Sequence, residues 1–382
     1  VMKYNGSGWE LVGNGGFSAG AATYLSLKFW NGVPYVAFVD AGNGSKTVLM
    51  KLEGNAWSGV GGGALSAGKS DFASLSIDNG FPYVAYQDQT NQFRGTLRKF
   101  NGSAWETVGG GAFSSSQANF ISLDVDNGIP YVAYRDTNVG MSRGTVMKFD
   151  GAWSTLGGNG FTSGAASDIS LYVYNGVPYM AYTDGANGDR TTVLKYEGGW
   201  QTVGSPGFSS DKTSFNSLAF ANGTPYVAYQ TYYAGNAEIR KWNGSGWELA
   251  GGAAYLAEGA YYISLAIHDG NPYLAFQHRG QGWKATVIKL KHAVVYDGSG
   301  STGGTDAFDG AGYESNAKVK VLANTGNLSK TGYTFAGWTL IADGSGTVYG
   351  ANDTFAIGSS AVELVRRDLV CEVDAQPLYG LL

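Results

Sequence analysis

The internal segment 120–158 reads FISLDVDNGIPYVAYRDTNVGMSRGTVMKFDGAWSTLGG. Its first part alternates apolar and polar residues, as a strand with one buried face does. Asn127-Gly128 then fits a two-residue hairpin turn, because both turn positions require a positive φ angle. The residues after this turn are almost all apolar and predict a strand covered on both faces. Four short strands are therefore expected, at Phe120–Asp126, Pro130–Tyr134, Thr145–Phe149 and Trp153–Leu156.

A repeat with intervals of 47 or 48 residues carries this pattern through residues 1–290. A Pro-Tyr pair opens the second expected strand of each unit, at Pro34, Pro82, Pro130, Pro178, Pro225 and Pro272. A tryptophan opens the fourth strand, at Trp9, Trp57, Trp105, Trp153, Trp200 and Trp247. A lysine marks the third strand, at Lys3, Lys51, Lys99, Lys148, Lys195, Lys241 and Lys289. Four-stranded units of this length are typical of a β-propeller, and a stacked solenoid, whose repeats are usually shorter, is the alternative.

The order of residues within one unit resembles kelch-type propellers, which have aromatic residues in strands two and three and a tryptophan opening strand four. The double glycine departs from kelch, because it follows strand four instead of strand two. The motifs PYVAYxD and VMKxNGxxWxxVG are more similar to bacterial extracellular repeats. That resemblance covers residues 1–290 and implies a propeller fold and an extracellular or cell-surface location, without implying an activity.

The number of strands bears on how the ring closes. First, second and fourth strands occur six times, whereas third strands occur seven times, from Val1–Tyr4 to Thr286–Leu290. We therefore expect an all-β, six-bladed propeller over residues 1–290, in which Trp9–Val12 completes the last blade beside Thr286–Leu290. Val1–Tyr4 is then surplus, and a larger ring is the alternative.

Composition narrows the class of protein further. Glycine accounts for 60 of the 382 residues and charged residues for 14%, which excludes a coiled coil, a helical bundle and a disordered chain. The net charge of −5 gives no electrostatic footprint for nucleic acid. No apolar run approaches the roughly 20 residues that span a bilayer, and no signal peptide is visible. Cys371 is the single cysteine, so a disulfide within the chain is impossible. We expect a monomer.

Residues 291–365 depart from the repeat and form a second expected domain. Their motifs resemble an internalin-type B repeat, a small β-grasp-like module of bacterial surface proteins. The resemblance implies an extracytoplasmic spacer or adhesive unit without catalytic residues, and residues 366–382 are an atypical tail for which disorder is one interpretation. The matching motifs are Tyr296-Asp-Gly, Gly326-Asn-Leu, Thr331–Trp338 and Asp343–Gly346. The core of the module is expected around Tyr333, Phe335 and Trp338.

An aspartate ends the second strand of four units, at Asp40, Asp88, Asp136 and Asp184, whereas Thr231 and His278 stand in the other two. A ring of carboxylates could bind calcium or sugar hydroxyls. Alternatively, each side chain caps its own loop in an Asx turn, and repetition at one structural position favours this interpretation. The loop Asp184–Asp189 is the most similar to a calcium site, but it lacks EF-hand spacing; no other cofactor is expected. The recurrent tryptophans and Pro-Tyr tyrosines are expected to pack between blades.

The loops after the second and fourth strands must share one face of the ring, because successive strands alternate in direction. In the fifth and sixth units this face gains aromatic and polar residues that break the repeat, including Tyr255. Aromatic rings suit the apolar faces of sugars, and polar groups suit sugar hydroxyls. A ligand-binding site is expected there, and exposed aromatic residues without function are the alternative. Its candidate residues are Tyr232, Tyr233, Tyr261, Tyr262, His278, Arg279 and Trp283.

These patterns favour a non-catalytic bacterial surface or secreted protein whose propeller binds glycans or another cell-surface ligand in adhesion or recognition. A glycosidase or lyase is the second hypothesis, although the sequence shows no nameable pair of carboxylates. A purely structural spacer is the third. His268, His278 and His292 lack the spacing of metal ligands. The fold alone does not decide between these functions.

Overall fold

The computed structural model describes residues 1–233, 235–250, 259–292, 294–309, 311–314, 316–358 and 362–370. Within these ranges the chain consists of β-strands, loops and four short 3₁₀ turns, as the all-β prediction requires. No helix in the described part of the chain has the length and apolar character needed to cross a membrane.

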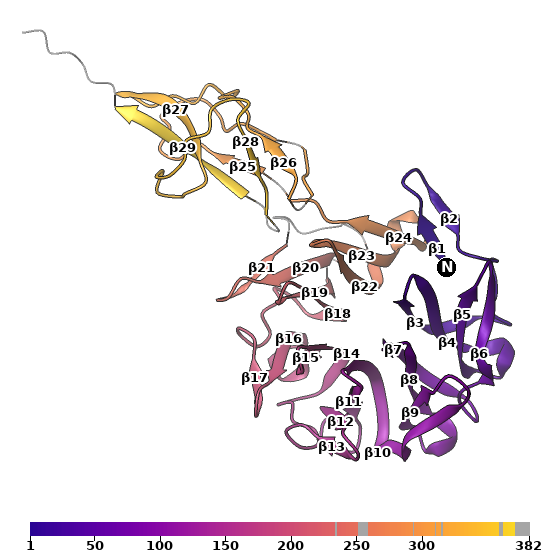
Figure 1. Cartoon of the computed structure of the whole chain (residues 1–382). Coiled ribbons are helices and arrows are strands. Elements are labelled where there is room, and N and C mark those ends of the chain that lie inside the picture. The colour runs from indigo at the N-terminus through magenta and orange to yellow at the C-terminus, as the bar shows by residue number, and fades with distance from the viewer. Residues whose placement is uncertain are drawn as a thin grey trace, which may run out of the picture.

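Six repeat units, numbered here as sheets 1 to 6 in chain order, are arranged around a common axis (Figure 1). Sheets 2 and 3 share strand β10 and are thereby joined into one seven-stranded sheet. Strands of each sheet pair antiparallel in sequence order. Sheet 1 contains β3 (Ala22–Trp30), β4 (Val33–Asp40), β5 (Lys46–Glu53) and β6 (Ala56–Ala64). Sheet 2 contains β7 (Ser70–Asp78), β8 (Phe81–Asp88), β9 (Arg94–Phe100) and the first part of β10 (Trp105–Asp126). Sheet 3 contains the second part of β10, β11 (Ile129–Asp136), β12 (Arg143–Phe149) and β13 (Trp153–Thr155). Sheet 4 contains β14 (Ala166–Tyr174), β15 (Val177–Asp184), β16 (Arg190–Tyr196) and β17 (Trp200–Thr202). Sheet 5 contains β18 (Thr213–Ala221), β19 (Thr224–Thr231), β20 (Ala237–Trp242) and β21 (Trp247–Leu249). Sheet 6 contains β22 (Ala260–His268), β23 (Asn271–His278) and β24 (Lys284–Lys289).

The first strand of each sheet is the innermost one. Serines from all six first strands line one central cavity of about 950 Å³, which a linear solenoid would keep apart. The turn after each first strand has the expected geometry; Asn127 and Gly128, for example, have φ angles of 51° and 79°. The sequence did not reveal a bulge in each first strand, which gives a bulky residue such as Phe120 or Tyr262 a positive φ.

Apolar residues between neighbouring sheets form the core of the ring. The buried Leu49 of sheet 1, for example, shares a cluster with Leu75 and Tyr86 of sheet 2. Five of the recurrent tryptophans add one hydrogen bond each, because their indole N–H donates to a backbone carbonyl of the preceding outer strand. Trp105 Nε1, for example, lies 2.9 Å from the carbonyl oxygen of Val60. The structure therefore confirms that these tryptophans pack between sheets.

Closure of the ring differs from the prediction. Strand β2 (Trp9–Leu11) pairs with β1 (Met2–Tyr4), and β24 has β23 as its strand partner in the described part of the chain, so the expected pairing of residues 9–12 with 286–290 is wrong. Strands β1 and β24 carry the same third-strand pattern, so either could pair with the same edge of β2. Strand β1 is the one that pairs, because a turn at Asn5 connects it directly to β2. The Asn5 side chain accepts hydrogen bonds from the N–H groups of Ser7 and Gly8 in this turn.

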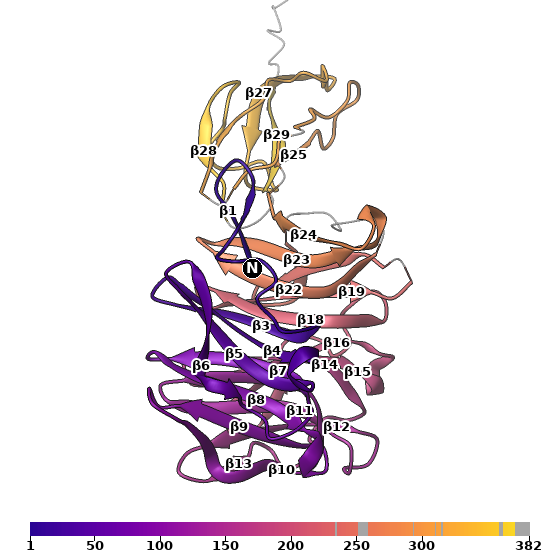
Figure 2. The ribbon, with the colours of Figure 1, turned by 90° about the vertical axis from the view of Figure 1, so that its right-hand side faces the viewer.

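The C-terminal module follows sheet 6 and lies outside the ring (Figure 2). Its strands β25 (Val294–Asp297), β29 (Val362–Val370) and β27 (Tyr333–Thr339) form one sheet, in which β25 and β29 are parallel. Strands β26 (Lys318–Lys320) and β28 (Thr354–Ala356) form a second sheet.

The module has its own apolar core, and this core corrects two expectations. Trp338 is fully buried there and Phe335 packs against the cluster, as expected, but Tyr333 is exposed, and Lys330 lies over its ring. Strand β29 also continues past residue 365, because Arg366 and Asp368 pair with β27. The boundary expected at 365 was therefore placed too early.

Candidate functional site

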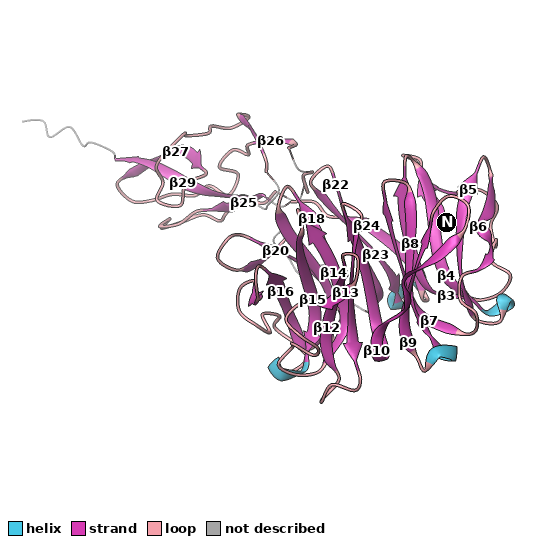
Figure 3. Ribbon diagram, turned by 60° about the horizontal axis from the view of Figure 1, so that its bottom comes forward, coloured by secondary structure: helices cyan, strands magenta, loops and turns pink. Residues whose placement is uncertain are grey.

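The loops after the second strands begin with a short 3₁₀ turn in sheets 1, 2, 4 and 6 (Figure 3). The carboxylates of Asp40, Asp88, Asp136 and Asp184 each accept a hydrogen bond from the backbone N–H two residues later. These aspartates are buried, and their hydrogen bonds have the pattern of Asx caps, as the structural interpretation predicts. Across the described residues, no three His, Cys, Asp or Glu side chains are grouped closely enough to hold a metal ion.

A pocket of about 480 Å³ lies on this loop face between sheets 5 and 6. Four of the candidate residues line it, namely Tyr232, Tyr233, Tyr261 and Arg279. Tyr233 is 79% exposed, so its ring is available to a ligand. We call this the aromatic pocket; its remaining lining residues are Gly235, Gly259 and Gly280.

Backbone hydrogen bonds, one between the two sheets and one within sheet 6, hold the floor of the aromatic pocket. The N–H of Gly259 donates to the carbonyl of Gly235 at 3.1 Å, and the N–H of Arg279 donates to the carbonyl of Gly259 at 2.9 Å. Gly259 has a φ of +79°, and a Cβ atom there would lie 2.6 Å from the Cβ of Arg279. Position 259 therefore requires glycine, which lets the Arg279 side chain lie directly over the backbone.

Sheet 5 and the loop before it position the two adjacent tyrosines. The N–H of Tyr232 donates to the carbonyl of Lys212 at 2.8 Å, and the N–H of Tyr233 donates to the Asp211 carboxylate at 3.0 Å. Lys212 Nζ lies 2.9 Å from Asp189 Oδ2, and this contact raises the pKa of Lys212, with smaller contributions from both tyrosines. An ion pair of Lys212 with Asp189 therefore lies beside the aromatic pocket.

The three other candidate residues lie outside the lining of the aromatic pocket. Trp283 is 52% exposed and its ring lies 5.3 Å from that of Tyr261, so it extends the aromatic surface. Tyr262 is exposed and packs on Phe215, at the bulge of β22. His278 is half-buried and contacts Phe276. Tyr255 lies outside the described residues.

Sequence reasoning missed Asp211, Lys212 and the two floor glycines. Asp211 and Lys212 belong to the linking loop before β18, on the expected face, but the aromatic residues are the ones that break the repeat pattern there. Gly235 and Gly259 are two among 60 glycines, so only the fold distinguishes them.

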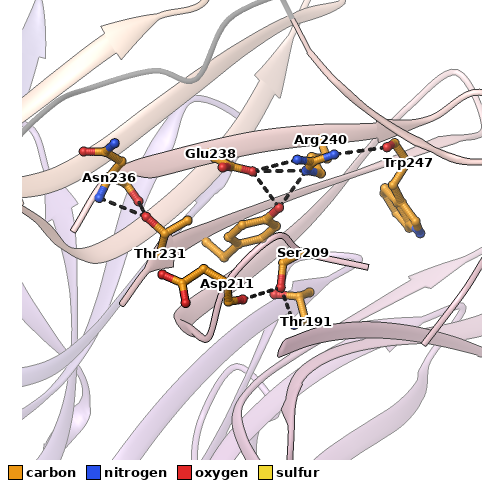
Figure 4. A network of polar contacts seen from close by, with 9 residues as sticks. Thr191, Ser209, Asp211, Thr231, Asn236, Glu238, Arg240 and Trp247 are labelled. Atoms are coloured by element: carbon orange, nitrogen blue, oxygen red, sulfur yellow. Dashed lines mark hydrogen bonds and ion pairs between the residues drawn. The ribbon is translucent and has the colours of Figure 1, made fainter. Parts of the chain in front are cut away.

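A second polar cluster lies inside the ring, between sheets 4 and 5 (Figure 4). The Tyr229 hydroxyl donates to Glu238 at 2.8 Å and accepts from Arg240 Nε at 2.7 Å. Burial raises the pKa of Tyr229, whose side chain has no exposed surface. Because Tyr229 is fully buried and Glu238 nearly so, we assign the cluster a structural role.

The central cavity contains one acid in its described lining, Asp124. Burial raises the pKa of Asp124, and Lys28 opposes that effect most strongly. The carboxylate accepts hydrogen bonds from the N–H of Val173 at 2.8 Å and from Ser76 Oγ at 3.3 Å. A hydrolytic mechanism with two carboxylates would need a second acid beside it.

No protein-family model matches the sequence, and no curated protein matches it either. Among solved structures, the SapL1 lectin in complex with α-methyl fucoside is 17% identical, with a TM-score of 0.50, over 72% of this chain and 92% of the lectin. The Aleuria aurantia lectin with Fucα1-6GlcNAc is 15% identical over 69% of this chain and 90% of its own, with a TM-score of 0.49. A Trypanosoma rangeli sialidase with sialic acid is 11% identical over 70% of this chain and 54% of its own, with a TM-score of 0.45. At 17% identity the likeness to the SapL1 lectin concerns the fold alone, and with the radial sheets it assigns the repeat region to the β-propellers.

Proposed function

We propose that the propeller is a non-catalytic glycan-binding domain and that the aromatic pocket holds the sugar. The observation that carries this proposal is the convergence of three tyrosines and one arginine in a pocket of about 480 Å³. This volume falls within the roughly 300–1,000 Å³ of small-molecule sites. The same residues break a repeat that is otherwise regular, so packing of the ring does not explain them.

The chemistry of the pocket suits a sugar better than an apolar ligand. The rings of Tyr233 and Trp283 offer exposed flat surfaces for the C–H face of a pyranose. Tyrosine hydroxyls and the Arg279 guanidinium donate hydrogen bonds to sugar hydroxyls or to a sugar carboxylate.

A glycan-processing enzyme is the second candidate, and Asp124 is the observation in its favour. An acid with a raised pKa inside a cavity is typical of catalytic sites. Release of reducing ends from glycans bound by the protein would support an enzymatic function. Loss of that release in Asp124→Asn would assign the enzymatic activity to the central cavity.

The second domain bears on where the protein acts. We propose that the C-terminal module is an internalin-like spacer or adhesive unit, so the propeller would be presented at a bacterial surface. Its separate core supports a role as an independent domain.

A glycan array with the full chain tests the main proposal, followed by titration of the best ligand into variants. Tyr233→Ala and Trp283→Ala should each weaken binding about tenfold or more, since one stacked aromatic ring contributes roughly 1–3 kcal/mol by analogy with stacked bases. Phe93→Ala is the matched control, because Phe93 is an exposed aromatic residue at the position of sheet 2 that corresponds to Trp283. The proposal fails if no glycan binds, or if the control weakens binding as much as the pocket variants.

A further inference from the structure

A ladder of hydrogen bonds connects the innermost strands of neighbouring sheets. In five interfaces a serine Oγ accepts a bond of 2.9–3.0 Å from the N–H of a leucine in the next sheet. The ladder runs through the pairs Ser26–Leu75, Ser74–Leu123, Ser122–Leu171, Ser170–Leu218 and Ser217–Leu265. A closed six-sheet ring would add Ser264 and Leu27, but no hydrogen bond joins these two described residues. The ring is therefore interrupted between sheets 6 and 1.

Both walls of this interruption expose apolar side chains that are buried elsewhere in the repeat. Leu27 of β3 is 45% exposed, whereas the five leucines at its position in the other sheets are at most 7% exposed. Leu25 and Phe29 on the same strand are exposed as well. On the opposite wall Val287 of β24 is 40% exposed, whereas its five counterparts are at most 1% exposed. We call these four residues the open flank.

Strands β1 and β2 show what the open flank lacks. They pair Tyr4 with Trp9, in the register that joins third and fourth strands in the other sheets, such as Phe149 with Trp153. The carbonyl of Val12 accepts the indole N–H of Trp57 at 2.8 Å, as Val60 does from Trp105. Hence β1 and β2 occupy the positions of the third and fourth strands of a further sheet, and no described strand occupies the positions of its first two.

Two observations, one on the central cavity and one on the edge of β1, fit the binding of added strands at this position. The central cavity extends over Leu25, Leu27 and Phe29 to Val1 and Met2 of the β1 segment. The inner edge of β1 pairs with no other described strand, so its backbone groups can accept an added strand.

We propose that the open flank binds a β-hairpin with the sequence pattern of the first two strands of this repeat, supplied by a further copy of the repeat. Its second strand would pair with β1, with the tyrosine of its Pro-Tyr opposite Lys3, as Tyr35 lies opposite Lys51 in sheet 1. Its serine would accept the N–H of Leu27, and the N–H of its leucine would donate to Ser264. Its apolar face would cover the open flank, and the ladder would then run unbroken around seven sheets.

A synthetic peptide of residues 166–184, which form the β14–β15 hairpin, tests the proposal. Fluorescence anisotropy of the labelled peptide should show saturable binding to the full chain, and the peptide should raise the melting temperature of the protein. Leu27→Asp and Val287→Asp should each weaken binding at least tenfold, because each places a charge on one wall. Met141→Asp is the matched control, since Met141 is an exposed apolar residue in a loop.

Three results would overturn the proposal. The first is absence of saturable binding to a chain that circular dichroism shows to be folded. The second is equal binding of the wild type and of both flank variants. The third is a dimer in light scattering that Leu27→Asp dissociates, without peptide binding, because a second copy of the chain would then occupy the flank. Glycan binding at the aromatic pocket would be unaffected by any of these results.

Discussion

Replacing Asp184 with alanine tests whether the repeated aspartates are structural caps. Its carboxylate is 1% exposed and accepts four hydrogen bonds. The donors are the N–H of Ala186 at 3.0 Å, Asn187 Nδ2 at 2.8 Å, Thr192 Oγ1 at 2.8 Å and the Tyr182 hydroxyl at 3.0 Å. Alanine would leave these donors without an acceptor in a site that water cannot easily enter.

The magnitude follows from the number of buried donors. Each unsatisfied buried group costs about 1–3 kcal/mol, and partial rearrangement of the loop relieves some of them. A loss of roughly 3–5 kcal/mol in the free energy of unfolding is therefore expected. At about 2 °C per kcal/mol for a large domain, the melting temperature should fall by about 6–10 °C.

Differential scanning calorimetry of Asp184→Ala and of a matched control measures this effect. Asp189→Asn is the control, because the contact of Asp189 with Lys212 is exposed, such pairs contribute about 0–1 kcal/mol, and asparagine tolerates the positive φ of this position. If both variants melt together, the cap does not stabilise the sheet as argued. If calcium raises the melting temperature of the wild type but not of Asp184→Ala, the loop binds calcium and the structural interpretation is wrong.

Three further predictions concern the sheet interfaces and the second domain. Trp105→Phe should lower the free energy of unfolding in urea by about 1 kcal/mol through loss of the bond to Val60, whereas Trp9→Phe should change it little, because the Trp9 ring is exposed. Burial and Lys241 lower the pKa of His292 in the folded protein, so the unfolded chain binds a proton more readily. Stability is therefore full above the unfolded pKa near 6.5 and is lost as the pH falls below it. Melting curves of the wild type should show that loss, and curves of His292→Gln should lack it. Deleting residues 294–370 should leave the melting temperature of the propeller nearly unchanged, because the module has its own core and its ion pair from Glu314 to Lys289 is exposed on the glutamate side; a large drop would show that the domains depend on each other.

Local features of the repeat were predictable because each depends on neighbours in sequence. Asn-Gly required a tight turn, and aspartates such as Asp184 could reach the N–H two residues later without any distant partner. Closure was not predictable in this way, since β1 and β24 have the same pattern and only the three-dimensional arrangement ranks them. Tyr333 was misplaced for a similar reason, because alternation marks a strand but does not say which face the module buries.

The candidate site likewise has residues that the sequence pattern reveals and contacts that only the fold reveals. Tyr232, Tyr233 and Trp283 stood out because they interrupt a regular pattern, and a repeat makes such interruptions easy to see. The convergence of Tyr233 with Arg279 depends on the contact between Gly235 and Gly259, which are far apart in sequence. A bond of the same kind joins other neighbouring sheets, as from the N–H of Thr213 to the carbonyl of Asp189, but only the fold shows which loops it brings together.

Strand β10 runs without a break from the outer edge of sheet 2 to the inner edge of sheet 3, over 22 residues. A force applied along the chain would therefore load both sheets through one backbone, with no slack loop between them to yield first. A single repeat of 48 residues releases about 170 Å of contour length at roughly 3.5 Å per residue. In optical tweezers these two sheets should extend together, in one step of about 340 Å.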